Sequence, residues 1–190
     1  TYYANSNPRL AFFKHFLVGR EGEVTSGILI PNDAYQDNVA IQYDKPTNTS
    51  PLDRANTNYA SSNYILRVAD SPNNYEFASL MRYRIDFDDR LEFSKAEIQI
   101  DAYTQFYRHN NSSNAVNFSR TTADWDEHTV TWNTRPAIDS SSSITIPATT
   151  TIGYDPVHDR DTVSILPFVD YWLENPDENF GFEMALQTYG

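Results

Sequence analysis

Short segments in which apolar and polar residues alternate recur along this chain of 190 residues. The alternation has a period of two, which places successive side chains on opposite faces of a β-strand. In the clearest segment Ser79, Met81, Tyr83, Ile85 and Phe87 form one face, while Arg82, Arg84 and Asp86 form the other. Similar patterns occur in Ala96, Ile98, Ile100 and Ala102, and in Phe180, Phe182, Met184 and Leu186. Shorter candidate strands are residues 39–43, 64–68, 116–119, 129–132 and 143–146.

Connections rich in Asn, Ser, Pro and Asp separate these strands, so the pattern predicts an all-β sandwich. One short helix is expected near residues 166–174. Pro167 suits a first helical turn, and Pro176 would stop the helix. Residues 108–117 and 137–143 are expected to be exposed loops.

Composition narrows the class of protein. The length fits one domain with a sizeable core, and no run of 18 apolar residues is present to cross a membrane. The net charge of −12 argues against binding to nucleic acid and is compatible with calcium or neutral glycans. Cysteine is absent, so disulfides and thiolate chemistry are excluded.

A longer motif gives a specific resemblance. Residues 125–136 read WDEHTVTWNTRP, a helical Val169-Asp170-Tyr171-Trp172 follows, and Asn179-Phe180-Gly181 opens the last strand. Asp33-Ala34-Tyr35, Asn58-Tyr59-Ala60-Ser61, the strand around Arg82 and Lys95-Ala96 precede the motif in a matching order. Over residues 28–187 the chain resembles DNRLRE-type domains.

The resemblance implies a secreted, jelly-roll β-sandwich related to carbohydrate-binding modules. Residues 28–190 would form this domain, and residues 1–27 would form an N-terminal arm or extra strand. The expected function is non-catalytic, extracellular binding of polysaccharide or glycosylated surfaces in an adhesive or structural role. No motif for nucleophilic, phosphoryl-transfer or zinc chemistry occurs in the sequence.

Aromatic rings that could stack on sugars are the first candidates for a binding site. Trp125 lies at the turn before a candidate strand and is the candidate for an exposed ring, with packing in the interior as the alternative. Tyr103, Tyr107 and Arg108 lie near a predicted loop and would form part of a binding strip. Trp132 and Trp172 are expected to pack in the interior instead, and Glu127 is expected to pin its loop.

Calcium is the cofactor that the acidic clusters favour, because hard oxygen ligands suit this ion. Asp155, Asp159 and Asp161 lie within one short segment. Asp86, Asp88 and Asp89 form a second group, and neither follows an EF-hand pattern. A solvated acidic surface is the alternative interpretation of both groups.

The N-terminal arm suggests a second function. It is rich in apolar residues, and the given sequence ends before the final edge strand expected from the resemblance, either because that strand is absent or because the sequence is truncated. If the strand is absent, a groove with unpaired backbone groups would remain. The arm could fill this groove in its own chain or in a neighbour, which would assemble a filament by strand donation. The residues expected to insert are Leu10, Phe12, Phe13, Phe16 and Val18.

Deletion of residues 1–27 distinguishes these possibilities. If the arm is donated to a neighbour, the deletion removes both assembly and stability, because the acceptor groove loses its strand. Light scattering of the intact and shortened chains measures this. An intact chain with a mass near 21.8 kDa in solution would exclude strand donation.

Overall fold

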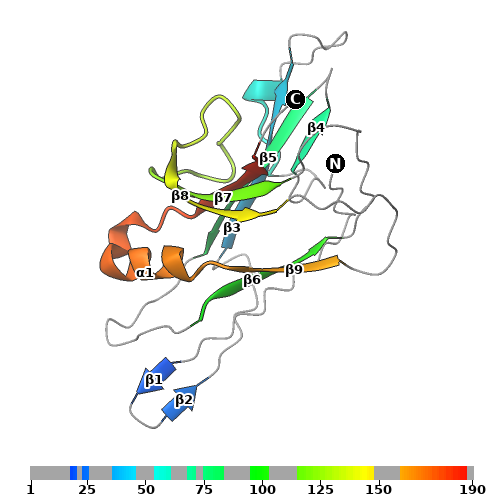
Figure 1. Ribbon diagram of the computed structural model, residues 1–190. Coiled ribbons are helices and arrows are strands. Elements are labelled where there is room, and N and C mark those ends of the chain that lie inside the picture. The colour runs from blue at the N-terminus through cyan, green and yellow to red at the C-terminus, as the bar shows by residue number, and fades with distance from the viewer. Residues whose placement is uncertain are drawn as a thin grey trace.

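A computed structural model describes residues 18–20, 23–25, 36–45, 54–60, 68–71, 75–83, 95–102, 115–147 and 159–187 (Figure 1). The strands are β1 (Val18–Arg20), β2 (Glu23–Thr25), β3 (Gln36–Asp44), β4 (Ala69–Ser71), β5 (Tyr75–Tyr83), β6 (Glu97–Ala102), β7 (Val116–Thr121), β8 (Ile138–Ile146), β9 (Asp159–Ser164) and β10 (Phe182–Leu186). The helices are α1 (Leu166–Glu174) and the 3₁₀ turns η1 (Arg54–Asn56) and η2 (Pro176–Glu178).

The described strands form one large antiparallel sheet and two small ones. The large sheet has the order β3-β5-β10-β7-β8, and β4 also pairs with β5. β6 pairs with β9 to form the opposing layer, and β1 pairs with β2 in a hairpin. The last strand, β10, lies between β5 and β7, which is the kind of long return that sandwiches and jelly rolls use. The predicted all-β sandwich with one short helix is confirmed.

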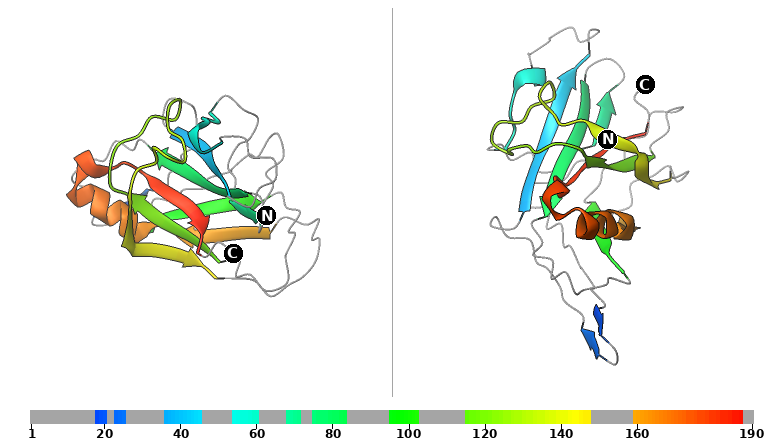
Figure 2. Two further views of the ribbon diagram at one scale, coloured as in Figure 1. Left: turned by 90° about the horizontal axis from the view of Figure 1, so that it is seen from above. Right: turned by 90° about the vertical axis from the view of Figure 1, so that its left-hand side faces the viewer.

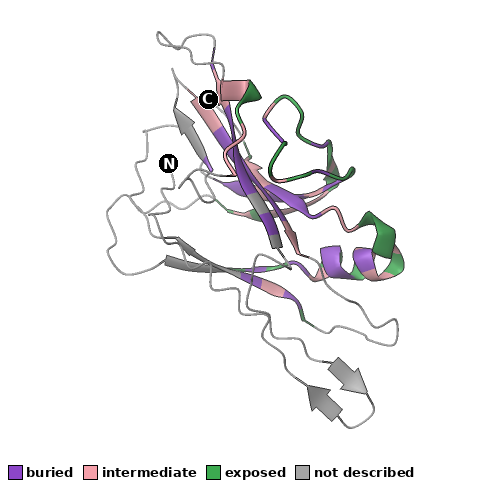
Figure 3. Ribbon diagram, turned by 180° about the vertical axis from the view of Figure 1, so that it is seen from behind, coloured by how far each residue is buried: buried purple, intermediate pink, exposed green. Residues whose placement is uncertain are grey.

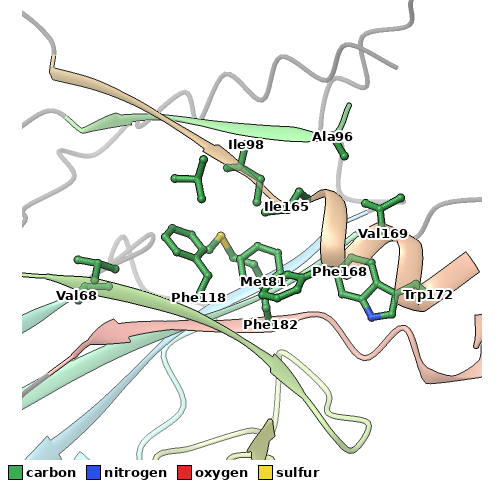
Figure 4. Packing of buried hydrophobic residues seen from close by; sticks show 12 residues of the cluster. Val68, Met81, Ala96, Ile98, Phe118, Ile165, Phe168, Val169, Trp172 and Phe182 are labelled. Carbon is green, nitrogen blue, oxygen red and sulfur yellow. The ribbon is translucent and has the colours of Figure 1, made fainter. Parts of the chain in front are cut away.

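The main core lies between the large sheet and the β6–β9 pair (Figure 4). Both layers contribute apolar side chains, and helix α1 closes one end of the layers with Phe168, Val169 and Trp172 (Figure 2). Trp172 is only 1% exposed, as expected for a packing residue. The buried members are Val68, Met81, Ala96, Ile98, Val116, Phe118, Val163, Ile165, Phe168, Val169, Trp172 and Phe182.

The opposite face of the large sheet, here called the outer face, is also covered in part. The segment between β7 and β8, residues 122–137, is named the β7–β8 loop, and it packs Trp125 and Val130 on this face. Their partners include Ala78 and Leu80 of β5. Because Met81 belongs to the core on the other side, β5 is buried on both faces, as the purple central strands in Figure 3 show.

Helix α1 spans the residues predicted for it. Pro167 stands in the first turn, where its missing N–H removes no helical hydrogen bond. Val169 is fully buried, while Leu166 and Leu173 pack against the core from its edge. After the helix, the backbone N–H of Asn175 donates to the carbonyl of Tyr171.

Residues 129–132 do not form the predicted strand. Asp126 organises turns there instead: its carbonyl accepts the N–H groups of Thr129 and Val130, and its carboxylate accepts the N–H of His128 at 2.8 Å. The alternation of Val130 and Trp132 arose because both side chains face the sheet from a loop. An apolar alternation reports which side is buried and not the backbone pairing.

Residues 138–143 belong to β8 and not to the predicted loop, and residues 116–117 belong to β7. The serine-rich run is held in the sheet by the ion pair of Arg120 with Asp139 at 2.6 Å. Hydrogen bonds from Ser141 and Ser142, with the nearby Arg120 charge, lower the pKa of Asp139 to about 2. The pairing of β7 with β8 shifts its register between Phe118 and Arg120, and the two strands remain paired on both sides of this irregularity.

Other predictions lie outside the described residues. These are the candidate strand residues 64–67, the Asp86, Asp88 and Asp89 group, and Leu10, Phe12, Phe13 and Phe16 of the arm. Val18, the last assembly candidate, begins β1 and pairs with Thr25. The predictions of cis pairing and of donation in trans therefore stay predictions.

Gly181 sets the position at which β10 enters the sheet. Its φ of +84° lies in the left-handed region, which side chains other than glycine rarely adopt. A Cβ atom here would lie 2.2 Å from the carbonyl oxygen of Met81 on β5. The close approach of two backbones explains the glycine in the Asn-Phe-Gly motif.

Replacing Gly181 with Ala should destabilise the fold by at least about 2 kcal/mol, because the left-handed backbone and the backbone clash both oppose a Cβ. Urea unfolding followed by tryptophan fluorescence measures the loss. Ala137→Gly, which changes one methyl group at an exposed position, is the control and should cost less than about 1 kcal/mol. Equal stability of the Gly181 variant and the wild type would contradict the close approach.

Candidate functional site

Asn58 fixes the β7–β8 loop to the edge of the large sheet. Its side-chain amide donates to the carbonyls of Glu127 and Val130, both at 2.7 Å. Its carbonyl oxygen accepts the N–H of Ala60 at 3.1 Å. The Asn-Tyr-Ala-Ser motif thus satisfies carbonyl groups that the irregular loop leaves without a strand partner. Glu127 takes part through its main-chain carbonyl, and the expectation that its carboxylate pins the loop stays a prediction.

Arg82 fixes the beginning of the same loop. Its Nε donates to the carboxylate of Asp37 at 2.7 Å, and its other nitrogens reach the carboxylate of Asp124 and the carbonyl of Trp125. The guanidinium carbon also lies 5.1 Å from the ring centroid of Trp125, within range of a cation–π interaction. These contacts tie strands β3 and β5 to the loop through one side chain.

Trp125 is a core residue and not an exposed platform. Only 6% of it is exposed, and its indole N–H donates to the carbonyl of Phe180 at 2.7 Å. The hydroxyl of Thr121 donates to the same carbonyl at 2.7 Å. The expectation of an exposed Trp125 ring was wrong, because the loop that carries it folds back over the sheet. No free face of this ring is offered to a ligand.

A contiguous row of aromatic and charged side chains runs from β3 across the loop to β10. Trp132 stacks on Tyr43 with a centroid separation of 5.6 Å. The guanidinium carbon of Arg135 lies 3.8 Å from the Trp132 ring, and its Nε lies 3.8 Å from Oε2 of Glu183. Trp132 packs against the apolar cluster that contains Trp125 and Val130, but its side chain is half-buried. It is therefore less enclosed than the sequence predicted.

Beyond this row, the outer face of β10, β7 and β8 carries polar side chains. Glu183 is opposite Ser119, and Ala185 is opposite Asn117, which faces Thr145. Ser119 and Ser143 share a hydrogen bond at 2.6 Å, and Thr145 donates to Asn117 at 2.8 Å. We call these residues the outer-face strip: Asn117, Ser119, Ser143, Thr145 and Glu183.

The outer-face strip opens toward β8. Glu183 and Ser119 are buried, Asn117 and Ser143 are half-buried, and Thr145 is exposed. Hydroxyl and amide groups on such a surface can both donate and accept hydrogen bonds. Sheet strands fix their spacing, since opposite residues stand about 5 Å apart and alternate residues along a strand about 7 Å apart.

Glu183 is the least satisfied group in the strip. It is 7% exposed, and within the described part of the chain no donor forms a hydrogen bond to its buried Oε2. Burial raises the pKa of Glu183 because it disfavours the charged form, and the charge of Arg135 opposes this effect. Arg135 is partly exposed, so solvent weakens its compensation.

The remaining predicted site residues are not tested by these contacts. Tyr103, Tyr107, Arg108 and Asp155 lie outside the described residues, while Asp159 and Asp161 stand on β9, opposite Ala102 and Ile100. Among the side chains that the structure describes, no group of three acidic or histidine residues is arranged to hold a metal. Binding of calcium by Asp155, Asp159 and Asp161 stays a prediction.

Sequence reasoning missed most of the outer-face strip. Asn117 and Ser143 were each placed at the boundary between a predicted loop and a candidate strand, and Thr145 was considered only as part of a candidate strand. For Glu183, a carboxylate within an otherwise apolar closing strand was the signal that could have revealed it.

Comparison with known proteins identifies the family. A model of carbohydrate-binding module family 96 matches residues 41–158, which is more than half of the chain. The protein therefore belongs to this family of carbohydrate-binding modules. No curated protein and no solved structure matches the chain. In the part of the chain that the structure describes, no helix is long and apolar enough to cross a membrane.

The buried Glu183 predicts a specific dependence of stability on pH. Its pKa in the folded state is raised above the ordinary 4.5, so this group favours folding at low pH and loses that contribution as pH rises through the raised value. Glu183→Gln has no such loss. The stability of this variant relative to wild type should therefore increase between about pH 4 and about pH 7.

Thermal unfolding of both chains across this range measures the difference. Glu174→Gln, at an exposed position on helix α1, controls for the loss of a carboxylate as such. A wild-type minus Glu183→Gln difference that stays constant with pH would show that burial does not disfavour the charged form.

Proposed function

We propose that this protein is a non-catalytic, extracellular module that binds polysaccharide or glycosylated surfaces through the outer-face strip. The observation that carries the proposal is a row of hydroxyl and amide side chains on fixed strands, beside the half-buried indole of Trp132. Sugars present several hydroxyl groups and apolar ring faces at once. A flat polar surface next to an aromatic ring is complementary to both.

The strip is suited to binding because the fold keeps its residues rigid. The loop that carries Trp132 is fixed by Asn58 and Arg82. The loop therefore loses little conformational entropy when a ligand binds beside Trp132. The sheet beneath is buried on its other face by the main core. The family membership of the chain supports a carbohydrate as the ligand.

Other parts of the expected function remain predictions that belong to this proposal. Tyr103, Tyr107 and Arg108 would extend the binding surface, and calcium held by Asp155, Asp159 and Asp161 would fix a neighbouring segment. Extracellular location and DNRLRE-type character rest on the motif order and the family. No observation on the described residues favours assembly into a filament, and we retain that function only as a prediction for the arm.

The proposal is tested by affinity electrophoresis of the chain in gels that contain soluble β-glucan, xylan, mannan or a polyuronate. We expect retardation by at least one polysaccharide. The double variant Asn117→Ala/Thr145→Ala should then bind at least about tenfold more weakly, because it removes two side chains that hydrogen-bond the ligand.

Thr162→Ala is the matched control, since Thr162 is also an exposed strand threonine but lies on β9 of the opposing layer. It should bind as wild type does. Equal weakening by the control and the double variant, or no weakening by either, would place binding elsewhere on the molecule.

A further inference from the structure

The outer-face strip contains one group whose presence is costly for folding. Glu183 stands on β10 between Leu80 of β5 and Ser119 of β7. The hydroxyl of Ser119 already shares a hydrogen bond with Ser143, and the side chain of Leu80 has no hydrogen-bond donor. The carboxylate is left with Arg135, whose Nε at 3.8 Å from Oε2 is beyond hydrogen-bond distance.

Such a carboxylate destabilises the folded chain, because a buried charge needs both a counter-ion and hydrogen-bond donors. A neutral residue at this position would pack against Leu80 without this cost. A buried carboxylate oxygen without a protein donor is a position where a water, an ion or a ligand can supply the hydrogen bond.

The neighbours of Glu183 show where a ligand would enter. Arg135 touches both the Trp132 ring and Glu183, and its side chain is 35% exposed. Arg135 therefore joins the indole to the carboxylate. If Arg135 turns toward solvent, it uncovers the indole and the carboxylate together.

We propose that Glu183 is the specificity-determining acceptor of the module, and that a hydroxyl group of the bound sugar donates to it in place of Arg135. The proposal rests on the function proposed above. A pyranose ring that replaces the guanidinium on Trp132 keeps the indole covered. Its hydroxyl gives Oε2 a hydrogen bond that no donor of the described residues provides.

The test compares wild type with Glu183→Gln on the polysaccharide that retards wild type most strongly, together with thermal unfolding at pH 7. We expect binding to weaken about tenfold, since a hydrogen bond to a charged acceptor is roughly twice as strong as one to a neutral amide. The unfolding temperature should not fall. A purely structural carboxylate would lose binding only together with stability.

Each outcome decides between the two proposals. If wild type binds no polysaccharide of the panel, the proposed function fails and this inference fails with it. If wild type binds and Glu183→Gln binds equally well, only the role of Glu183 is overturned. Glu174→Gln should leave binding unchanged.

A second measurement needs only the wild-type chain and serves if Glu183→Gln does not fold. Binding replaces the charge of Arg135 beside Glu183 with a neutral donor hydroxyl, so it changes the pKa of this carboxyl group and should exchange protons with the solvent. Isothermal titration calorimetry with that polysaccharide, in buffers of different ionisation enthalpy, measures the number of protons taken up or released. Binding without proton exchange across about pH 4 to about pH 7 would overturn the assignment.

Discussion

The carbonyl group of Phe180 is the point on which the arrangement of this module depends. It accepts hydrogen bonds from the Trp125 indole and the Thr121 hydroxyl, both at 2.7 Å. Gly181, with its left-handed backbone, directs the chain past Met81 and into the sheet immediately afterwards. The two most specific motifs in the sequence therefore meet here, since one supplies the indole and the other the carbonyl. Without this junction, the β7–β8 loop would lose its buried anchor.

Anchoring the loop has a consequence for the whole outer face. Trp125 and Val130 cover the apolar half over β3 and β5, whereas the polar half over β10, β7 and β8 is buried at Glu183 and Ser119 and becomes exposed toward Thr145. The boundary between the halves is the row from Trp132 through Arg135 to Glu183. A rigid aromatic ring thus stands beside hydroxyl and amide groups of fixed spacing, which is a surface suited to a sugar.

The sequence was sufficient to predict the sandwich, the bounds of α1 and the faces of β6 and β10, because alternation and proline positions act locally. The sequence patterns did not predict features that depend on contacts between residues far apart in the chain. Trp125 was expected at the surface because a turn precedes it, but its indole N–H finds a carbonyl 55 residues away. The serine-rich sequence of β8 is typical of a loop, but the ion pair between Arg120 and Asp139 holds this segment in the sheet. Glu183 required knowledge of which strands flank β10, and alternation cannot give strand order.

The central claim is that sugar binds on the outer face beside Trp132. It is tested most directly by recording ¹H–¹⁵N correlation spectra of the chain while an oligosaccharide of the retained polysaccharide is added. We expect shift changes concentrated on Asn117, Thr145 and the Trp132 indole, with little change at the buried Trp172 of the core. Changes confined to the β6–β9 layer, or to residues other than Trp132 and the outer-face strip, would contradict sugar binding at this site.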